Sequence, residues 1–98
     1  GMREVASHVL PKGAEVILFG SRARGDARTD SDWDILILID GGKATGEDFE
    51  KFAYPFVDYG WSVGEQINPL IYSFEDWNKR SITPFYKNVQ LEGVSLCH

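Results

Sequence analysis

Cysteine, histidine and long apolar runs are all scarce in this sequence of 98 residues. The single cysteine, Cys97, excludes a disulfide within the chain, and we expect a reducing, cytoplasmic location. The longest apolar run, residues 35–39, is far shorter than the roughly 20 residues of a membrane-spanning helix, so no membrane segment is expected. The two histidines, His8 and His98, have no partner at metal-ligand spacing and are interpreted as bystanders.

Positive charge is in short supply as well. Lys and Arg number 10 against 15 Asp and Glu, which gives a net charge of −5. Because affinity for nucleic acid depends on clustered Lys and Arg, a nucleic acid is not expected as a partner. A small phosphorylated ligand remains compatible, since a metal ion can offset its charge. The short chain predicts a single domain over residues 2–98, and Gly1 in front of Met2 is interpreted as a remnant of tag removal.

Hydrophobic periodicity predicts an alternation of helices and strands. Apolar runs indicate strands at 15–19, 33–39 and 67–72. Pro69 favours a sheet edge or a bulge for the last of them, because proline has no amide donor. Helices are expected near 5–10, from Thr45, from Ser73 and from Thr83, with a kink or break near Tyr54 caused by Pro55. This order predicts an α+β (two-layer α/β) fold, a small mixed sheet of three to four strands with helices mainly on one face.

Two carboxylates, Asp32 and Asp34, stand at the start of the most apolar strand. Residues two apart on a strand project to the same side, so these acids repel each other unless a cation lies between them. Mg²⁺ prefers such oxygen ligands. An EF-hand is a competing interpretation of the acids at 30, 32 and 34, but it fails because Ile35 and Gly41 stand where that loop needs Gly and Glu.

Gly20 and Ser21 follow the preceding strand, where glycine permits close approach of a ligand and serine offers a hydroxyl. A phosphate tail is therefore expected at this bend. Arg22 is the arginine of the following loop most expected to reach a phosphate, because it is adjacent to Ser21. Arg24 and Arg28 are expected to pair with the nearby acids Asp26 and Asp30 on the surface.

The pattern Gly20-Ser21, ten intervening residues and Asp32-Trp33-Asp34 resembles the signature of the polymerase β-like nucleotidyltransferases. The short spacer and residues 84–94 are similar to the minimal nucleotidyltransferase (MNT) subgroup. The resemblance implies a nucleotidyltransferase fold, nucleotide binding by Gly20 and Ser21, and Mg²⁺ binding by the catalytic pair Asp32 and Asp34. It also implies transfer of a nucleoside monophosphate to a hydroxyl with loss of pyrophosphate. Some members are antitoxins beside an all-helical HEPN partner, and some of those adenylylate it.

Active members of that family usually carry a third acid on the following strand, where it helps to deprotonate the attacking hydroxyl. Matching residues 67–71 to that strand puts Asn68 at this position. Glu65 is the nearest acid and can serve as the third acid if the register is shifted by three residues, an odd shift that reverses the face of the strand.

Two functions therefore remain open. One is a Mg²⁺-dependent enzyme that transfers AMP from ATP to a hydroxyl of a partner protein or small molecule. The other is a catalytically weak or inactive antitoxin or binding subunit that docks on a helical HEPN-type partner. Some of the aromatic side chains are expected to form such a partner surface, because a domain this small cannot bury all of Tyr54, Tyr59, Trp61, Trp77 and Tyr86.

Overall fold

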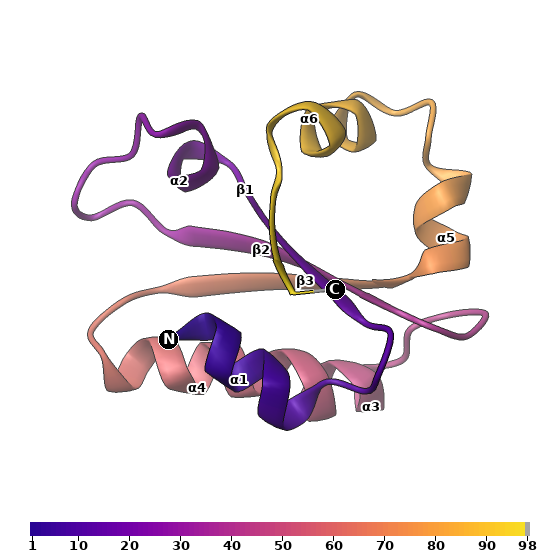
Figure 1. Cartoon of the computed structure of the whole chain (residues 1–98), viewed down its shortest axis with the longest axis horizontal. Coiled ribbons are helices and arrows are strands. Elements are labelled where there is room, and N and C mark those ends of the chain that lie inside the picture. The colour runs from indigo at the N-terminus through magenta and orange to yellow at the C-terminus, as the bar shows by residue number, and fades with distance from the viewer. Residues whose placement is uncertain (98) are drawn as a thin grey trace.

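The computed structural model describes residues 1–97, whose four strands form one mixed sheet (Figure 1). The strands lie in the spatial order β3-β2-β1-β4. β1 (Glu15–Phe19) pairs antiparallel with β2 (Trp33–Ile39) and with β4 (Val94–Cys97), whereas β2 pairs parallel with β3 (Ile67–Ser73). The first three strands lie where the sequence predicts them, and β4 was not predicted individually. His98 lies outside the described residues.

β2 is the centre of the fold because all five of its residues from Ile35 to Ile39 are buried. Side chains alternate along a strand, so Ile35 and Ile37 pack into one apolar cluster while Leu36 and Leu38 pack into another on the opposite face. The sequence of a strand that is buried on both faces is a continuous run of apolar residues. Both faces of the sheet therefore need helical cover.

The helices cover both faces, as Figure 1 shows. Below the sheet in that view lie α1 (Met2–Val9) and a continuous helical run made of α3 (Gly46–Asp48), the π-helix η1 (Phe49–Ala53) and α4 (Tyr54–Ser62). Above it lie α2 (Ser21–Arg24), α5 (Phe74–Lys79) and α6 (Pro84–Glu92). The predicted α+β class is confirmed. The helices are less one-sided than the sequence suggested, because Leu36 and Leu38 require cover from Trp77 and Val89.

The two proline predictions have clear structural counterparts. Pro55 lies in the first turn of α4, and the π-helical stretch η1 comes immediately before it, where the expected irregularity near Tyr54 was placed. Pro69 lies on β3, which is an edge strand as predicted.

Three of the helix starts are capped by the residues that predicted them. Thr45 accepts from the backbone amide of Asp48 at 3.1 Å, and the Asp48 carboxylate accepts in return from the amide of Thr45 at 3.0 Å. Ser73 caps α5 and Thr83 caps α6 in the same way.

The aromatic side chains divide between core and surface. Trp77 is 3% exposed and contacts the rings of Tyr72, Phe85 and Tyr86. Tyr54 and Trp61 on α4 are 48% and 68% exposed. Within residues 1–97, the helices are all too short or too polar to cross a lipid bilayer.

Candidate functional site

Asp34 sits at the start of β2, between its two neighbouring strands. Its register partners are Phe19 on β1 and Asn68 on β3. Because Leu36 and Leu38 share its side of the strand, the Asp34 carboxylate faces the same side of the sheet as α5 and α6. The side chain is partly buried. Trp33, by contrast, packs into the cluster between the sheet and the helices α1 and α4.

The bend at Gly20 is in direct contact with Asp34. Gly20 has a φ of 77°, and a Cβ placed on it would lie only 2.6 Å from Asp34 Oδ2. Only glycine combines this backbone conformation with the space that the carboxylate occupies. The two halves of the sequence motif are therefore one structural unit, even though Gly20 and Asp34 are separated by a loop.

Asp32 is exposed and is held by the residue at the third-acid position. The Asn68 amide donates from Nδ2 to Asp32 Oδ2 at 3.0 Å, and Gln66 donates to Asn68 Oδ1 at 3.4 Å. Because Asn68 is also the register partner of Asp34, both aspartates are neighbours of the same asparagine. The structure thus places Asp34 against the Gly20 bend and joins Asp32 to the same corner through Asn68.

Ser21 begins α2 directly after this bend. Within residues 1–97, its hydroxyl makes no hydrogen bond, and the first amides of a helix have no partners inside the helix. Ser21 therefore offers polar groups that no other described part of the chain uses.

Arg22 has different partners from those that the sequence suggested. Its guanidinium lies 4.3 Å from the centroid of the Trp33 ring and donates to the Ser31 carbonyl at 2.7 and 3.1 Å and to the Thr29 carbonyl at 3.2 Å. Its Nη2 also lies 3.8 Å from a Glu65 carboxylate oxygen. A phosphate contact by Arg22 requires the guanidinium to leave these groups. In the structure, the residue ties the loop before Asp32 to α2.

Glu65 is not brought to the aspartates. It faces Arg22 and lines a cavity of about 260 Å³ together with Trp33, Tyr59 and Ile67, on the side of the sheet that α1 and α4 cover. This follows from its position an odd number of residues before Asn68, which reverses the direction of the side chain. Asn68, and not Glu65, is therefore the β3 side chain that contacts the aspartates.

The donor set at this corner fits a hard divalent cation. The Asp34 carboxylate lies against the Gly20 bend, the Asp32 carboxylate is joined to the same corner by Asn68, and carboxylate oxygens are preferred ligands of Mg²⁺. Within residues 1–97, no group of three or more His, Cys, Asp or Glu side chains is placed to hold a metal ion. A metal ion bound by the two aspartates would therefore take its other ligands from phosphate or water.

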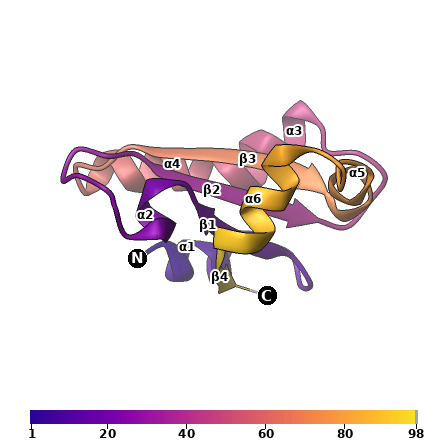
Figure 2. The same ribbon diagram turned by 90° about the horizontal axis from the view of Figure 1, so that it is seen from above.

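A pocket of about 200 Å³ adjoins the bend, between α2 and α6, which lie on the same face of the sheet in both views (Figures 1 and 2). The sequence interpretation missed it. A signal was present, because four lining residues recur at i, i+3, i+4 and i+7 on α6. Its walls are Phe19, Gly20, Arg24, Phe85, Asn88, Val89 and Glu92.

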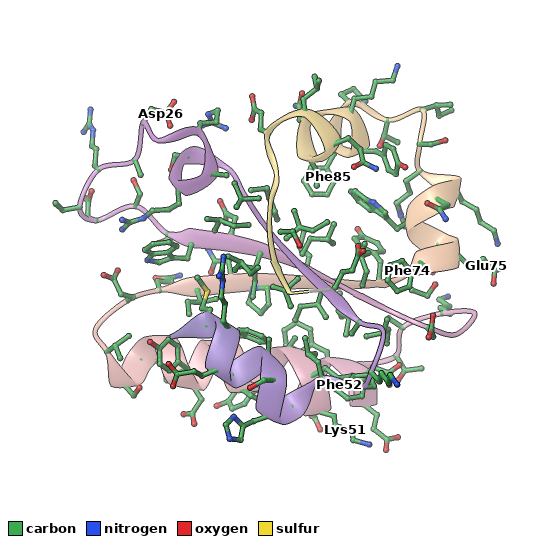
Figure 3. The ribbon with its side chains drawn as sticks, in the orientation of Figure 1. Asp26, Lys51, Phe52, Phe74, Glu75 and Phe85 are labelled. Atoms are coloured by element: carbon green, nitrogen blue, oxygen red, sulfur yellow. The ribbon has the colours of Figure 1, made fainter. Side chains whose placement is uncertain are left out.

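Ion pairs hold Arg24 at the rim of this pocket. Its Nε donates to Asp26 at 3.3 Å, as the sequence predicted, and its Nη1 donates to Glu92 on α6 at 3.4 Å. The hydrogen bond that Arg24 donates to Asp26, followed by the one that it donates to Glu92, raises the pKa of its guanidinium. In Figure 3, Phe85 points from α6 toward the sheet and Asp26 lies on the outer side of the loop after α2.

Comparisons with known proteins show which family the chain resembles. A family model described as nucleotidyltransferase domain matches residues 2–89. Two proteins of Methanocaldococcus jannaschii, both described as candidate protein adenylyltransferases, are similar to the chain. One is 38% identical over 79 residues, covering 81% of this chain and 73% of its own length. The other is 33% identical over 95 residues, covering 96% and 89%.

Two solved structures share the fold. One is a toxin–antitoxin complex with AMP-PNP, matched with a TM-score of 0.66 at 18% identity. The other is a mutant of the toxin–antitoxin complex MntA-HpeT, matched with a TM-score of 0.63 at 15% identity. Each match covers 98% of this chain and 69% of the other. At these identities the likeness concerns the fold alone.

Proposed function

The chain belongs to the nucleotidyltransferase domain family, and on that basis we propose that it transfers AMP from Mg²⁺-ATP to a hydroxyl of a partner protein or small molecule. One observation carries this proposal: the Asp34 carboxylate lies against the Gly20 bend, while Asn68 holds Asp32 beside it. Metal ligands and a phosphate-binding bend are thus adjacent in space. Phosphoryl and nucleotidyl transfer depend mainly on such positioning and charge stabilisation.

Each residue has a defined role in the proposed reaction. The Gly20 and Ser21 backbone and the Ser21 hydroxyl bind the triphosphate. Asp32 and Asp34 hold Mg²⁺, which offsets the negative charge of the phosphates when it is bound. The acceptor oxygen forms a bond to the α-phosphorus, the bond to the bridging oxygen breaks, and pyrophosphate leaves.

The hydroxyl proton has no carboxylate at the third position to receive it. Asn68 cannot accept a proton usefully, and its amide already donates to Asp32. In the proposed reaction the proton passes to water, and we therefore expect slow transfer. General-base assistance typically contributes about 10²–10⁴-fold to such a step.

A protein acceptor is favoured by the relatives. Both are described as candidate protein adenylyltransferases, and the structural neighbours come from toxin–antitoxin complexes. We propose a helical protein of the HEPN type as the acceptor, as the family resemblance implies. The exposed Tyr54 and Trp61 on α4 offer apolar surface for such a partner.

The site itself is tested by titrating Mg²⁺-ATP into wild type and into the double variant Asp32→Asn plus Asp34→Asn. We expect the double variant to lose binding, because the amides cannot replace both anionic ligands. The charge-matched control is Asp40→Asn plus Asp58→Asn, two exposed aspartates elsewhere. Equal binding by wild type and the site variant would end the nucleotide proposal.

A second candidate function is a binding subunit that retains nucleotide without transferring it. The Asn68–Asp32 hydrogen bond favours this alternative, because it replaces the expected third acid by a neutral donor. Incubation with α-labelled ATP and the protein encoded beside this one distinguishes the two. Label on the partner supports the transferase, whereas intact nucleotide binding with no labelled acceptor supports the binding subunit.

A further inference from the structure

The pocket between α2 and α6 begins where the proposed phosphate site ends. Gly20 belongs to both, because it lines the pocket and its bend touches Asp34. The volume of about 200 Å³ is below the ~300–1,000 Å³ of pockets that hold a whole drug-sized ligand. A molecule anchored at Gly20 and Asp34 can therefore place only one further group in this pocket.

The walls of the pocket are suited to a flat, uncharged group. Phe19 and Phe85 meet edge to face with centroids 5.3 Å apart, and Val89 extends this apolar surface. The charges at the rim cancel, since Arg24 pairs with Glu92 at 3.4 Å. A further phosphate would meet the Glu92 carboxylate and an arginine already engaged by two acids. An aromatic base meets no such charge penalty.

Asn88 lines the pocket with a polar side chain that has no partner within residues 1–97. It is exposed on α6, and its side chain makes no hydrogen bond to any of residues 1–97. A carboxamide offers one acceptor and two donors in the same plane. This arrangement matches the amino group and ring nitrogen of adenine, which asparagine recognises through two parallel hydrogen bonds.

Resting on the proposed function, we propose that this pocket is the nucleobase subsite of the same active site, in which Asn88 hydrogen-bonds the edge of adenine against the Phe19 and Phe85 rings. The triphosphate then extends across Gly20 to the two aspartates. Asn88 contributes to the choice of base, whereas Gly20, Ser21, Asp32 and Asp34 bind the part that every nucleoside triphosphate shares.

The test compares Mg²⁺-ATP with Mg²⁺-tripolyphosphate, which lacks base and ribose, by calorimetric titration of wild type and Asn88→Ala. Alanine suits this exposed helical position, so the fold is preserved. We expect Asn88→Ala to weaken ATP binding about 5- to 100-fold, the range that one bidentate base contact provides. Tripolyphosphate affinity should stay within about twofold, because its contacts lie at the bend. Asn78→Ala, an exposed asparagine on α5, is the matched control.

The outcomes separate this inference from the function on which it rests. If Asn88→Ala leaves ATP binding unchanged, or weakens ATP and tripolyphosphate equally, the base subsite is wrong while the phosphate site stands. If wild type binds neither ligand, the proposed nucleotide site itself fails, and the base subsite fails with it. Selective loss of ATP binding in Asn88→Ala, with Asn78→Ala equal to wild type, supports the subsite.

Discussion

The two faces of the sheet differ at the start of the central strand β2: one is apolar, and the other carries aspartates. On the face covered by α1 and α4, residues Ile35, Ala53 and Phe56 are completely buried, and the packing extends to the start of β2 through Trp33. On the other face, Leu36 and Leu38 are covered by Trp77 and Val89, but the start of the strand carries a partly buried Asp34 and the exposed Asp32.

This difference shows how a small domain combines a stable core with exposed carboxylates at one corner, the start of β2. Carboxylates are costly to bury without a partner, so they occur where the cover of one face ends. The opposite face, where Ile35, Ala53 and Phe56 are completely buried, supplies the rigidity that holds their geometry. If this comparison is right, substitutions on the packed face lower stability, whereas substitutions at the corner change ligand binding.

The largest effect is expected for Phe56→Ala on the packed face. Phe56 is fully buried, so its truncation should lower the free energy of unfolding by about 3–5 kcal/mol. Chemical denaturation measures this value. The exposed aromatic Trp61 on the same helix is the control, and Trp61→Ala should change stability by less than about 1 kcal/mol. Similar losses for both variants would contradict the assignment of α4 to the core.

Gly20→Ala should affect both stability and binding. The backbone conformation is strained for alanine by about 1–3 kcal/mol, and the new methyl group collides with the Asp34 carboxylate. We expect the affinity for Mg²⁺-ATP to fall by more than about tenfold, measured by calorimetry.

Gly64→Ala is a closely matched control for this change. Gly64 has a φ of 76°, against 77° for Gly20, but a Cβ there meets nothing within 4 Å. It should therefore carry the strain of a positive φ with unchanged nucleotide affinity. Equal losses of affinity in the two variants would mean that strain, and not contact with Asp34, determines the requirement for glycine.

Asn68→Asp should sharpen the contrast by restoring a third carboxylate to the corner. Without metal, the new charge repels Asp32 and Asp34 and lowers the melting temperature; with Mg²⁺, the affinity for the metal should rise by about tenfold. Thermal unfolding across a Mg²⁺ titration measures both effects. Asn78→Asp, on an exposed helix surface, should show neither. A stability loss that Mg²⁺ does not reverse would argue against metal binding here.

The smallest effect is expected for Arg22→Lys. Lysine keeps the charge but loses the fork that reaches the Ser31 and Thr29 carbonyls, so stability should fall by about 1 kcal/mol. A loosened Asp32 should weaken Mg²⁺-ATP binding by about threefold. Arg28→Lys is the control, because the Arg28 side chain is exposed and has no hydrogen bond within residues 1–97. A tenfold or larger loss for Arg22→Lys would favour direct phosphate contact instead.

Much of the fold was predictable because its signals are local. The apolar run of β2, the caps at Thr45 and Ser73, and the edge position of Pro69 each follow from a few neighbouring residues. The pairing of β4 with β1 was not predictable in this way. It joins residues 76 to 81 positions apart, and a strand of four residues has too weak a pattern to stand out.

The residues of the candidate site also divide into those with a local sequence signal and those without one. The spacing of Gly20, Asp32 and Asp34 indicates their grouping, and Asn68 follows from the match of the next strand. The partners of Arg22 were not predictable, because its guanidinium turns toward Trp33 through a contact that only the folded loop creates. The pocket at Asn88 also escaped prediction, since it forms between two helices that meet over the sheet.

The sequence by itself determined which side of each strand its residues occupy, since alternation along an extended backbone is a local property. It therefore predicted a shared face for the two aspartates, whereas the position of Glu65 beside Arg22 came from the structure. Only the tertiary structure decided what stands opposite those side chains: the glycine bend in contact with Asp34, the amide that holds Asp32, and the pocket beneath α6. Those neighbours depend on strand register and helix packing between distant segments, and no short stretch of sequence encodes them.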